Sequence, residues 1–140
     1  MIDSHPEWFK KALLVEKEKK IIKVEEGEIF YQHWGDKSKP GIVLVHGSGS
    51  HSHWWDFIAP QLLETFQVSA IDLSGMGESS HREDYSPELY AKEILSVAED
   101  SGFFKVGKPI ICGHSMGGFM TATAGYITDK ELTGVIMIDS

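Results

Sequence analysis

Short, mainly apolar runs that alternate with longer amphipathic stretches constrain the fold of this chain most strongly. Each of these runs is followed by a polar segment, as expected where a buried strand ends. The runs occupy residues 42–45, 68–71, 110–112 and 135–138. Apolar runs of this length are typical of strands that are buried on both faces of a parallel sheet.

Helical segments are predicted between these runs. The first follows Ser52 and ends at about Phe66, the second runs from Ser86 to Gly102, and the third from Ser115 to about Tyr126. Strand–helix alternation needs right-handed crossovers, which bring the carboxyl ends of the strands to one edge of the sheet. Sheets of this kind bind ligands at that edge. The candidate functional loops are therefore residues 46–52, 72–80 and 113–118.

The first part of the chain has a different pattern. An amphipathic stretch from Pro6 to Leu14 precedes the charged run Glu16 to Lys20, for which a solvated turn or helix end is expected. Two β-prone pieces, 21–24 and 29–34, flank Glu25-Glu26-Gly27, which predicts a hairpin. The chain of 140 residues is thus predicted to form one domain over 1–140, an α/β fold with a mostly parallel sheet, helices on both faces and an antiparallel first hairpin.

Composition limits the kinds of partner that the chain can have. A formal net charge of -8 disfavours binding to nucleic acid and to anionic membranes. The single cysteine, Cys112, cannot form an intrachain disulfide, and no segment approaches the ~20 apolar residues that cross a bilayer. Residues 1–20 lack the apolar stretch of a signal peptide. We therefore expect a cytoplasmic protein that acts on a small molecule and binds neither nucleic acid nor membrane.

The segment Gly113-His114-Ser115-Met116-Gly117-Gly118 lies between a predicted strand and a predicted helix. It matches the Gly-x-Ser-x-Gly nucleophile elbow, in which a tight turn presents a serine above the sheet. Glycines flank the serine because side chains there would collide with neighbouring backbone. The positive end of the following helix favours an oxyanion, and the Met116 N–H can donate to it. Ser115 is therefore the predicted nucleophile.

With this elbow, two further loops resemble the α/β-hydrolase superfamily over about Ile21 to Ser140. The run His46-Gly47-Ser48-Gly49 is similar to the family's oxyanion loop, and Asp72 to Ser79 is similar to its Asp-x-x-Gly-x-Gly-x-Ser loop after the fourth strand. The resemblance implies a truncated α/β-hydrolase fold, because the chain ends after the strand that is similar to the family's sixth. It implies Ser48 as the second backbone oxyanion donor, with Gly49 a weaker choice. It also implies hydrolysis of an ester or similar carbonyl substrate through an acyl-enzyme, without metal or cofactor. Epoxide hydrolases and haloalkane dehalogenases of this family carry aspartate at the elbow, so their chemistry is not expected.

The catalytic histidine is the main departure from the family pattern. The family order is serine, acid, histidine, and no histidine follows His114 in this chain. The final strands and the cap that the family usually carries are also absent. Asp139 occupies a strand end where some members place the acid, although a structural loop carboxylate is an alternative. His51, His53 and His81 lie on loops at the functional edge, where a surface role is expected rather than a rewired triad.

Three other interpretations stay open at this point. The chain could be a catalytically inactive fragment or an interaction module on a hydrolase scaffold. A Rossmann-like dinucleotide-binding domain would explain Gly47-x-Gly49 and the acid at Asp72, but not the elbow. A metal site at His51-x-His53 with Asp56 would lack a further histidine.

Strand 135–138 is predicted to lie at an edge of the sheet. It carries no charge or proline that would blunt an exposed edge. We therefore expect it to pair with another chain or with a missing C-terminal segment, or to cause aggregation.

Overall fold

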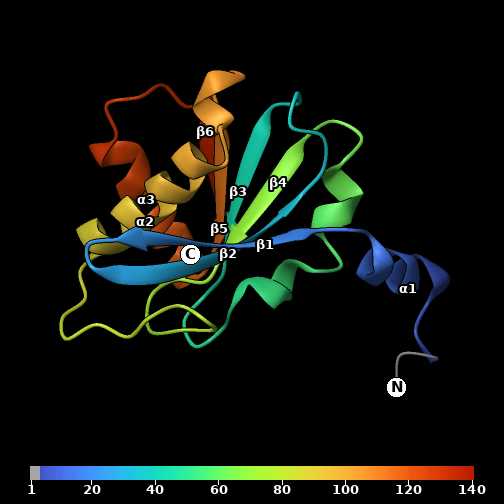
Figure 1. Cartoon of the computed structure of the whole chain (residues 1–140), viewed down its shortest axis with the longest axis horizontal. Helices are drawn as coiled ribbons and strands as arrows, with labels where there is room; N and C mark the ends of the chain where they lie inside the picture. Colours follow the sequence, from blue (N-terminus) through green and yellow to red (C-terminus); the bar gives the residue numbers. More distant parts are fainter. Residues whose placement is uncertain (1–3) are drawn as a thin grey trace.

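The computed structural model describes residues 4–140 and contains one six-stranded sheet with the order β1-β2-β4-β3-β5-β6 (Figure 1). The antiparallel pairs are β1–β2 and β2–β4, and the remaining pairs, β4–β3, β3–β5 and β5–β6, are parallel. This confirms the predicted fold class. The strands are β1 (Glu18–Val24), β2 (Gly27–Trp34), β3 (Gly41–Val45), β4 (Gln67–Ile71), β5 (Ile110–His114) and β6 (Gly134–Ile138).

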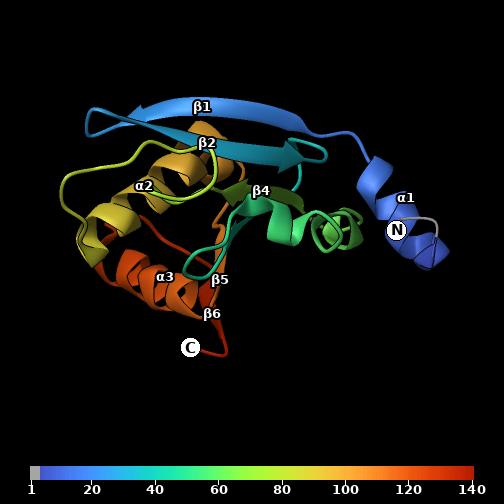
Figure 2. The ribbon, with the colours of Figure 1, turned by 90° about the horizontal axis from the view of Figure 1, so that it is seen from below.

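The α-helices α2 (Pro87–Asp100) and α3 (Met116–Ile127) pack side by side on one face of the sheet (Figures 1 and 2). Between them and the strands lies a cluster of buried apolar side chains that includes Val43, Ile94 and Ile111. The predicted start of α2 is confirmed, because the Ser86 hydroxyl accepts a hydrogen bond from the Leu89 N–H at 3.0 Å.

The opposite face is covered differently from the prediction. The segment expected to be helical up to about Phe66 forms two 3₁₀ turns, Ser52–Trp55 and Ala59–Leu62. One continuous helix would place Pro60 in its interior, where the ring clashes with the preceding turn and one backbone donor is lost. The second 3₁₀ turn instead has this proline near its start, where no preceding turn is in its way. Trp34, Trp55 and Leu44 lie in a second buried cluster on this face.

The N-terminal part differs from the prediction at the charged run. Strand β1 begins at Glu18, so residues 18–20 are not a turn or helix end. Lysines are common on edge strands because they oppose pairing with other chains. The hairpin itself is confirmed: Glu25 and Glu26 form its turn with φ of 47° and 67°. Helix α1 (Glu7–Leu14) projects beyond the sheet and contacts the segment between the two 3₁₀ turns, where the ring centroid of Phe57 lies 5.3 Å from that of Phe9 (Figure 2).

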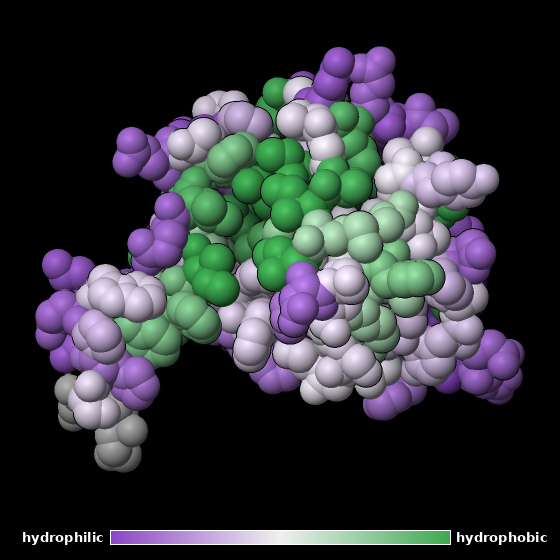
Figure 3. Space-filling view, turned by 180° about the vertical axis from the view of Figure 1, so that it is seen from behind, coloured by the Kyte–Doolittle hydropathy of each residue, from purple (hydrophilic) through white to green (hydrophobic). Residues whose placement is uncertain are grey.

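Strand β6 forms the edge of the sheet, and its side chains are exposed on both faces. The exposed fractions run from 40% for Val135 to 48% for Met137. Val135 is in register with Ile111 on the face of α3, whereas Ile136 is in register with Cys112 on the opposite face. Figure 3 views the side on which β6 lies and shows apolar side chains gathered there. The unpaired backbone edge of β6 and the apolar side chains on both of its faces are thus available to a further strand.

We predict that purified chain self-associates or aggregates through β6. A charge at an unpaired edge disfavours strand addition, so Ile136→Lys should shift the chain toward the monomer. Sedimentation velocity over a concentration series measures this shift. Ile21→Lys, on the opposite edge strand, is the control and should leave association unchanged. A wild-type chain that stays monomeric at high concentration contradicts the prediction.

Candidate active site

Ser115 occupies the turn between β5 and α3, with φ of 55° and ψ of -121°. A positive φ is rare for a residue with a Cβ and concentrates at functional sites. The side chain is exposed and does not cap α3. The predicted tight turn at Ser115 between a strand and a helix is therefore confirmed, while the nucleophilic role of Ser115 stays a prediction.

The glycines around Ser115 are required by close backbone approaches. A Cβ on Gly113 would lie 2.2 Å from the Gly117 carbonyl oxygen, and a Cβ on Gly117 would lie 2.2 Å from the His46 carbonyl oxygen. Neither backbone atom can move without disrupting the turn or the neighbouring loop. The glycine pattern thus lets the loop after β3 approach the turn that carries Ser115.

The last residue of β6 and a residue that follows it hold the Ser115 backbone on its other side. The Ser115 N–H donates to the Ile138 carbonyl at 2.9 Å, and the Ser140 hydroxyl donates to the Ser115 carbonyl at 2.9 Å. Asp139 lies between these two contacts, with φ of 51°. The candidate acid therefore sits beside Ser115 in the fold. The contact from Ser140 could not be predicted from the sequence, because the two residues lie 25 positions apart along the chain.

The loop after β3 forms a tight turn next to Ser115. The Ser50 N–H donates to the Gly47 carbonyl at 3.2 Å, and Gly49 has φ of 70°. A Cβ on Gly47 would lie 3.3 Å from the Ser115 Cβ. Within residues 4–140, neither the Ser48 N–H nor the Met116 N–H has a hydrogen-bond acceptor. Two free backbone donors thus flank the candidate nucleophile.

His46 is fully buried beneath this loop. The Leu73 N–H donates to its Nε2 at 3.0 Å, and its Nδ1 lies 2.7 Å from the Gly47 carbonyl oxygen. Burial lowers the pKa of His46 below its ordinary value, which favours the neutral ring. Sequence reasoning assigned His46 to the loop without identifying these contacts.

Asp72 is a structural residue of the loop after β4. Its buried carboxylate accepts the Ser52 N–H at 2.6 Å and the Glu78 N–H at 2.9 Å. A Cβ on Gly77 would lie 2.2 Å from the Asp72 Oδ2, which explains the glycine there. The loop after β3 leads into a 3₁₀ turn, so it lacks the helix N-terminus that holds a pyrophosphate. The structure thus offers no support for a dinucleotide site.

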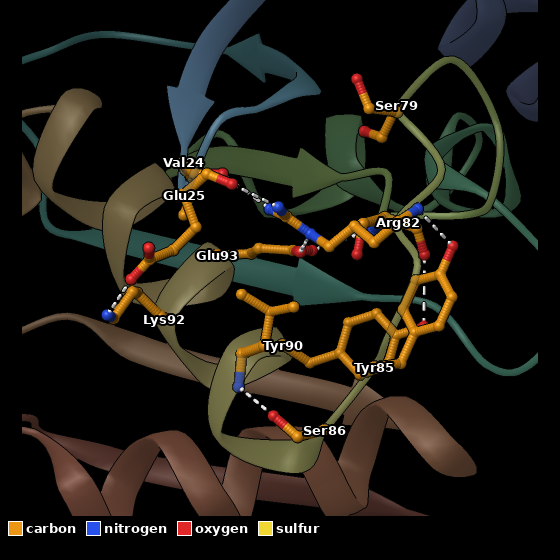
Figure 4. A network of polar contacts seen from close by, with 12 residues as sticks. Val24, Glu25, Ser79, Arg82, Tyr85, Ser86, Tyr90, Lys92 and Glu93 are labelled. Carbon is orange, nitrogen blue, oxygen red and sulfur yellow. Dashed lines mark hydrogen bonds and ion pairs between the residues drawn. The ribbon is translucent and has the colours of Figure 1, made fainter.

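A buried ion pair fastens the rest of this loop to α2 and to the first hairpin (Figure 4). Arg82 Nε donates to Glu93 Oε2 at 3.0 Å, and the two terminal nitrogens of Arg82 donate to the carbonyls of Val24 and Glu25. Glu93 Oε1 accepts the Ser74 N–H at 2.9 Å. Burial raises the pKa of Glu93, and hydrogen bonds from Ser74 and Arg82 oppose that rise.

The candidate histidines do not reach Ser115. His53 Nδ1 lies 2.7 Å from Asp56 Oδ2, and this pair contacts Gln32 on β2. In the sheet, β4 and β3 lie between β2 and β5, the strand that leads to Ser115. His51 and His81 are exposed. Within residues 4–140, none of these rings hydrogen-bonds the Ser115 hydroxyl. The surface role expected for these histidines therefore fits the structure better than a rewired triad.

The ring of His114 stacks on Trp54, with centroids 5.7 Å apart. Trp54 is 47% exposed, so this tryptophan is not part of the core, unlike Trp55. An exposed aromatic ring thus lies next to the residue that precedes Ser115.

No group of three or more potential metal ligands among His, Cys, Asp and Glu forms within the described part of the chain, residues 4–140. The His51-x-His53 motif therefore lacks a ligand set. In the same part of the chain, no helix is both long enough and apolar enough to span a bilayer.

Comparison with known proteins shows the family of the chain. Residues 42–140 match the model of the alpha/beta hydrolase family. Esterase Rv0045c of Mycobacterium tuberculosis is 29% identical over 121 residues, which cover 85% of this chain and 39% of the esterase. Protein phosphatase methylesterase 1 of Bos taurus is 35% identical over 106 residues, which cover 71% of this chain and 28% of that protein.

Solved structures show the same relationship. A membrane phospholipase A, described as a bacterial virulence factor, superimposes with a TM-score of 0.81 at 26% identity, covering 94% of this chain and 41% of that one. The thioesterase domain of the curacin biosynthetic pathway has a TM-score of 0.75 at 25% identity, covering 87% and 46%. The chain thus spans less than half the length of these relatives. Because the family model matches most of its length, the chain belongs to the alpha/beta hydrolase family.

Proposed function

We propose that this chain carries the nucleophile and the oxyanion donors of a serine hydrolase that acts on an ester or similar small carbonyl substrate. The observation that carries the proposal is an exposed, strained Ser115 flanked by the free N–H groups of Ser48 and Met116. Hydrogen-bond donors fixed in advance around a reacting carbonyl stabilise the negative charge that develops on its oxygen. The similarity to an esterase and a methylesterase supports this reaction class.

In the proposed reaction, the Ser115 Oγ forms a bond to the carbonyl carbon while its proton passes to a general base. Ser48 and Met116 donate to the resulting oxyanion. Collapse of the tetrahedral intermediate breaks the bond to the leaving alcohol, which takes up the proton. Water then attacks the acyl-enzyme, which releases the acid and restores the serine hydroxyl. No metal or cofactor is needed for these steps.

The general base is the unassigned part of this proposal. Because none of the described histidines reaches Ser115, we propose that a histidine outside residues 4–140 accepts the proton. Asp139 remains the candidate acid that would orient such a histidine, and the contacts of its neighbours Ile138 and Ser140 with the Ser115 backbone support this choice. The alternative role, a loop carboxylate that ends β6, predicts that Asp139→Asn leaves catalysis unchanged.

The cytoplasm remains the compartment in which we expect this protein to act.

A second candidate function is an inactive interaction module on the hydrolase scaffold. The exposed apolar side chains of β6 and the lack of a base near Ser115 favour it. The two functions differ in whether Ser115 forms an acyl-enzyme. We expect an acyl group on the peptide that contains Ser115 after incubation with an activated ester, an acid quench and mass spectrometry. Acylation confined to lysines would support the inactive module instead.

A further inference from the structure

We infer that His46 is a positioning residue for the proposed oxyanion hole: its ring sets the direction of the Ser48 N–H by holding the carbonyl of the same peptide group. This inference rests on the proposed function and adds a residue to its machinery. His46 would not touch the substrate, because its ring is fully buried and both ring nitrogens already have partners.

The geometry of the peptide group links the two ends of this contact. The Gly47 carbonyl and the Ser48 N–H belong to one planar trans peptide, so they point in opposite directions. His46 Nδ1 lies 2.7 Å from this carbonyl oxygen, and the Ser50 N–H donates to it at 3.2 Å. With the oxygen held on one side, the N–H must point to the other side, away from the turn.

The protonation state of the ring follows from its partners. A backbone N–H can only donate, so the Leu73 N–H requires an unprotonated Nε2 on His46. The single proton of the neutral ring is therefore on Nδ1, where it can be donated to the Gly47 carbonyl. The contact at Nδ1 is thus a hydrogen bond and not a repulsion between two lone pairs.

Neighbouring contacts hold His46 itself in place. Leu73 directly follows Asp72, whose carboxylate accepts the Ser52 N–H at 2.6 Å. The loop after β3 is therefore fastened to the loop after β4 on both sides of the Gly47–Ser50 turn. The His46 carbonyl also packs against Gly117, at the first turn of α3. His46 thereby connects the loop that carries Ser48 to the helix that follows Ser115.

Two substitutions separate positioning from mere packing. His46→Asn keeps a side-chain N–H that can reach the Gly47 carbonyl but loses the bond to Leu73, whereas His46→Leu loses both. Residual dipolar couplings of the Ser48 N–H report its direction without any need for catalysis. We expect wild-type-like couplings in His46→Asn and altered couplings in His46→Leu. Equal couplings in wild type and His46→Leu would overturn the inference.

A measurement on the wild-type chain needs no variant to fold. Nitrogen-15 spectra of the His46 ring should show the proton on Nδ1, with a coupling across the hydrogen bond from the Leu73 N–H. A proton on Nε2 would exclude the bond to Gly47 and overturn the inference.

Labelling kinetics test the catalytic consequence. With imidazole as an external base, the maximal rate at which a fluorophosphonate labels Ser115 should fall about ten- to hundred-fold in His46→Leu. This is less than the roughly 10²–10³-fold cost of removing one oxyanion donor, because the Ser48 N–H is misdirected and not lost. The probe concentration at half-maximal rate should stay unchanged, and His46→Asn should retain most of the rate. A His46→Leu variant that labels at the wild-type rate would contradict the inference alone. A wild-type chain that never labels would contradict the proposed function, while the couplings would still decide the role of His46.

Discussion

Replacing Ser115 by alanine is expected to remove all imidazole-dependent hydrolysis of an activated ester by this protein. The wild-type chain alone should be only feebly active, since its oxyanion donors act without a base. Imidazole added as an external base should raise the wild-type rate by up to about 10²-fold, the lower end of what general-base catalysis contributes. After subtraction of the hydrolysis by imidazole itself, Ser115→Ala should show no such rise.

Two variants serve as controls for this experiment. Ser96→Ala removes a hydroxyl from α2, away from the candidate site, and should respond to imidazole as wild type does. Asp139→Asn should also respond as wild type does, because a candidate acid has no catalytic histidine to orient when the base comes from solution. If Ser115→Ala kept the imidazole-dependent rate, another residue would be the nucleophile.

Arg82→Met is expected to destabilise the fold by about 3–5 kcal/mol, because it leaves a buried carboxylate without its partner. The side chain of Glu93 is completely buried and that of Arg82 is 9% exposed. Methionine also lacks the N–H groups that Arg82 donates to the Val24 and Glu25 carbonyls. Urea unfolding followed by circular dichroism measures the loss of stability.

The loss of stability in Arg82→Met should also depend on pH, in a direction that can be checked. Burial raises the pKa of Glu93, and the loss of Arg82 would raise that pKa further. A buried carboxyl group whose pKa is raised in the folded state destabilises the fold when it is charged. This destabilisation decreases as the pH falls and the group takes up a proton. The deficit of Arg82→Met should therefore be smaller at pH 5 than at pH 8.

Matched variants separate the buried ion pair from a surface contact. The double variant Arg82→Met with Glu93→Gln should recover part of the stability, since glutamine is neutral and its oxygen can still accept the Ser74 N–H. Lys92→Met removes an exposed ion pair with Glu25 and should change stability little. Equal losses in Lys92→Met and Arg82→Met would contradict the special role of the buried pair.

The strands and the turn at Ser115 could be predicted from the sequence because their signals are local. Apolar runs mark the buried strands, and Gly113 and Gly117 mark the tight turn. The segment that forms two 3₁₀ turns misled the prediction because its apolar residues suit a helix, while Pro60 excludes a continuous one. The start of β1 was missed because an edge strand with lysines has the composition of a solvated turn.

The contacts that hold the site together could not be predicted in the same way. His46 meets Leu73, and Arg82 meets the turn at Glu25, only after β2, β3 and β4 have paired. Which nitrogen of His46 carries the proton depends on a backbone donor 27 residues away. Such details follow from the fold and not from any motif within the loop itself.

The most direct test of the proposed serine hydrolase is fluorophosphonate labelling of the unaltered 140-residue chain. Labelling is followed by intact mass and peptide mapping, with and without imidazole. We predict weak labelling of the chain alone, a rise with imidazole concentration, a single modified residue at Ser115 and no labelling of Ser115→Ala. Strong labelling without imidazole that survives the replacement of His51, His53 and His81 by alanine would contradict the account, because no described base would explain it.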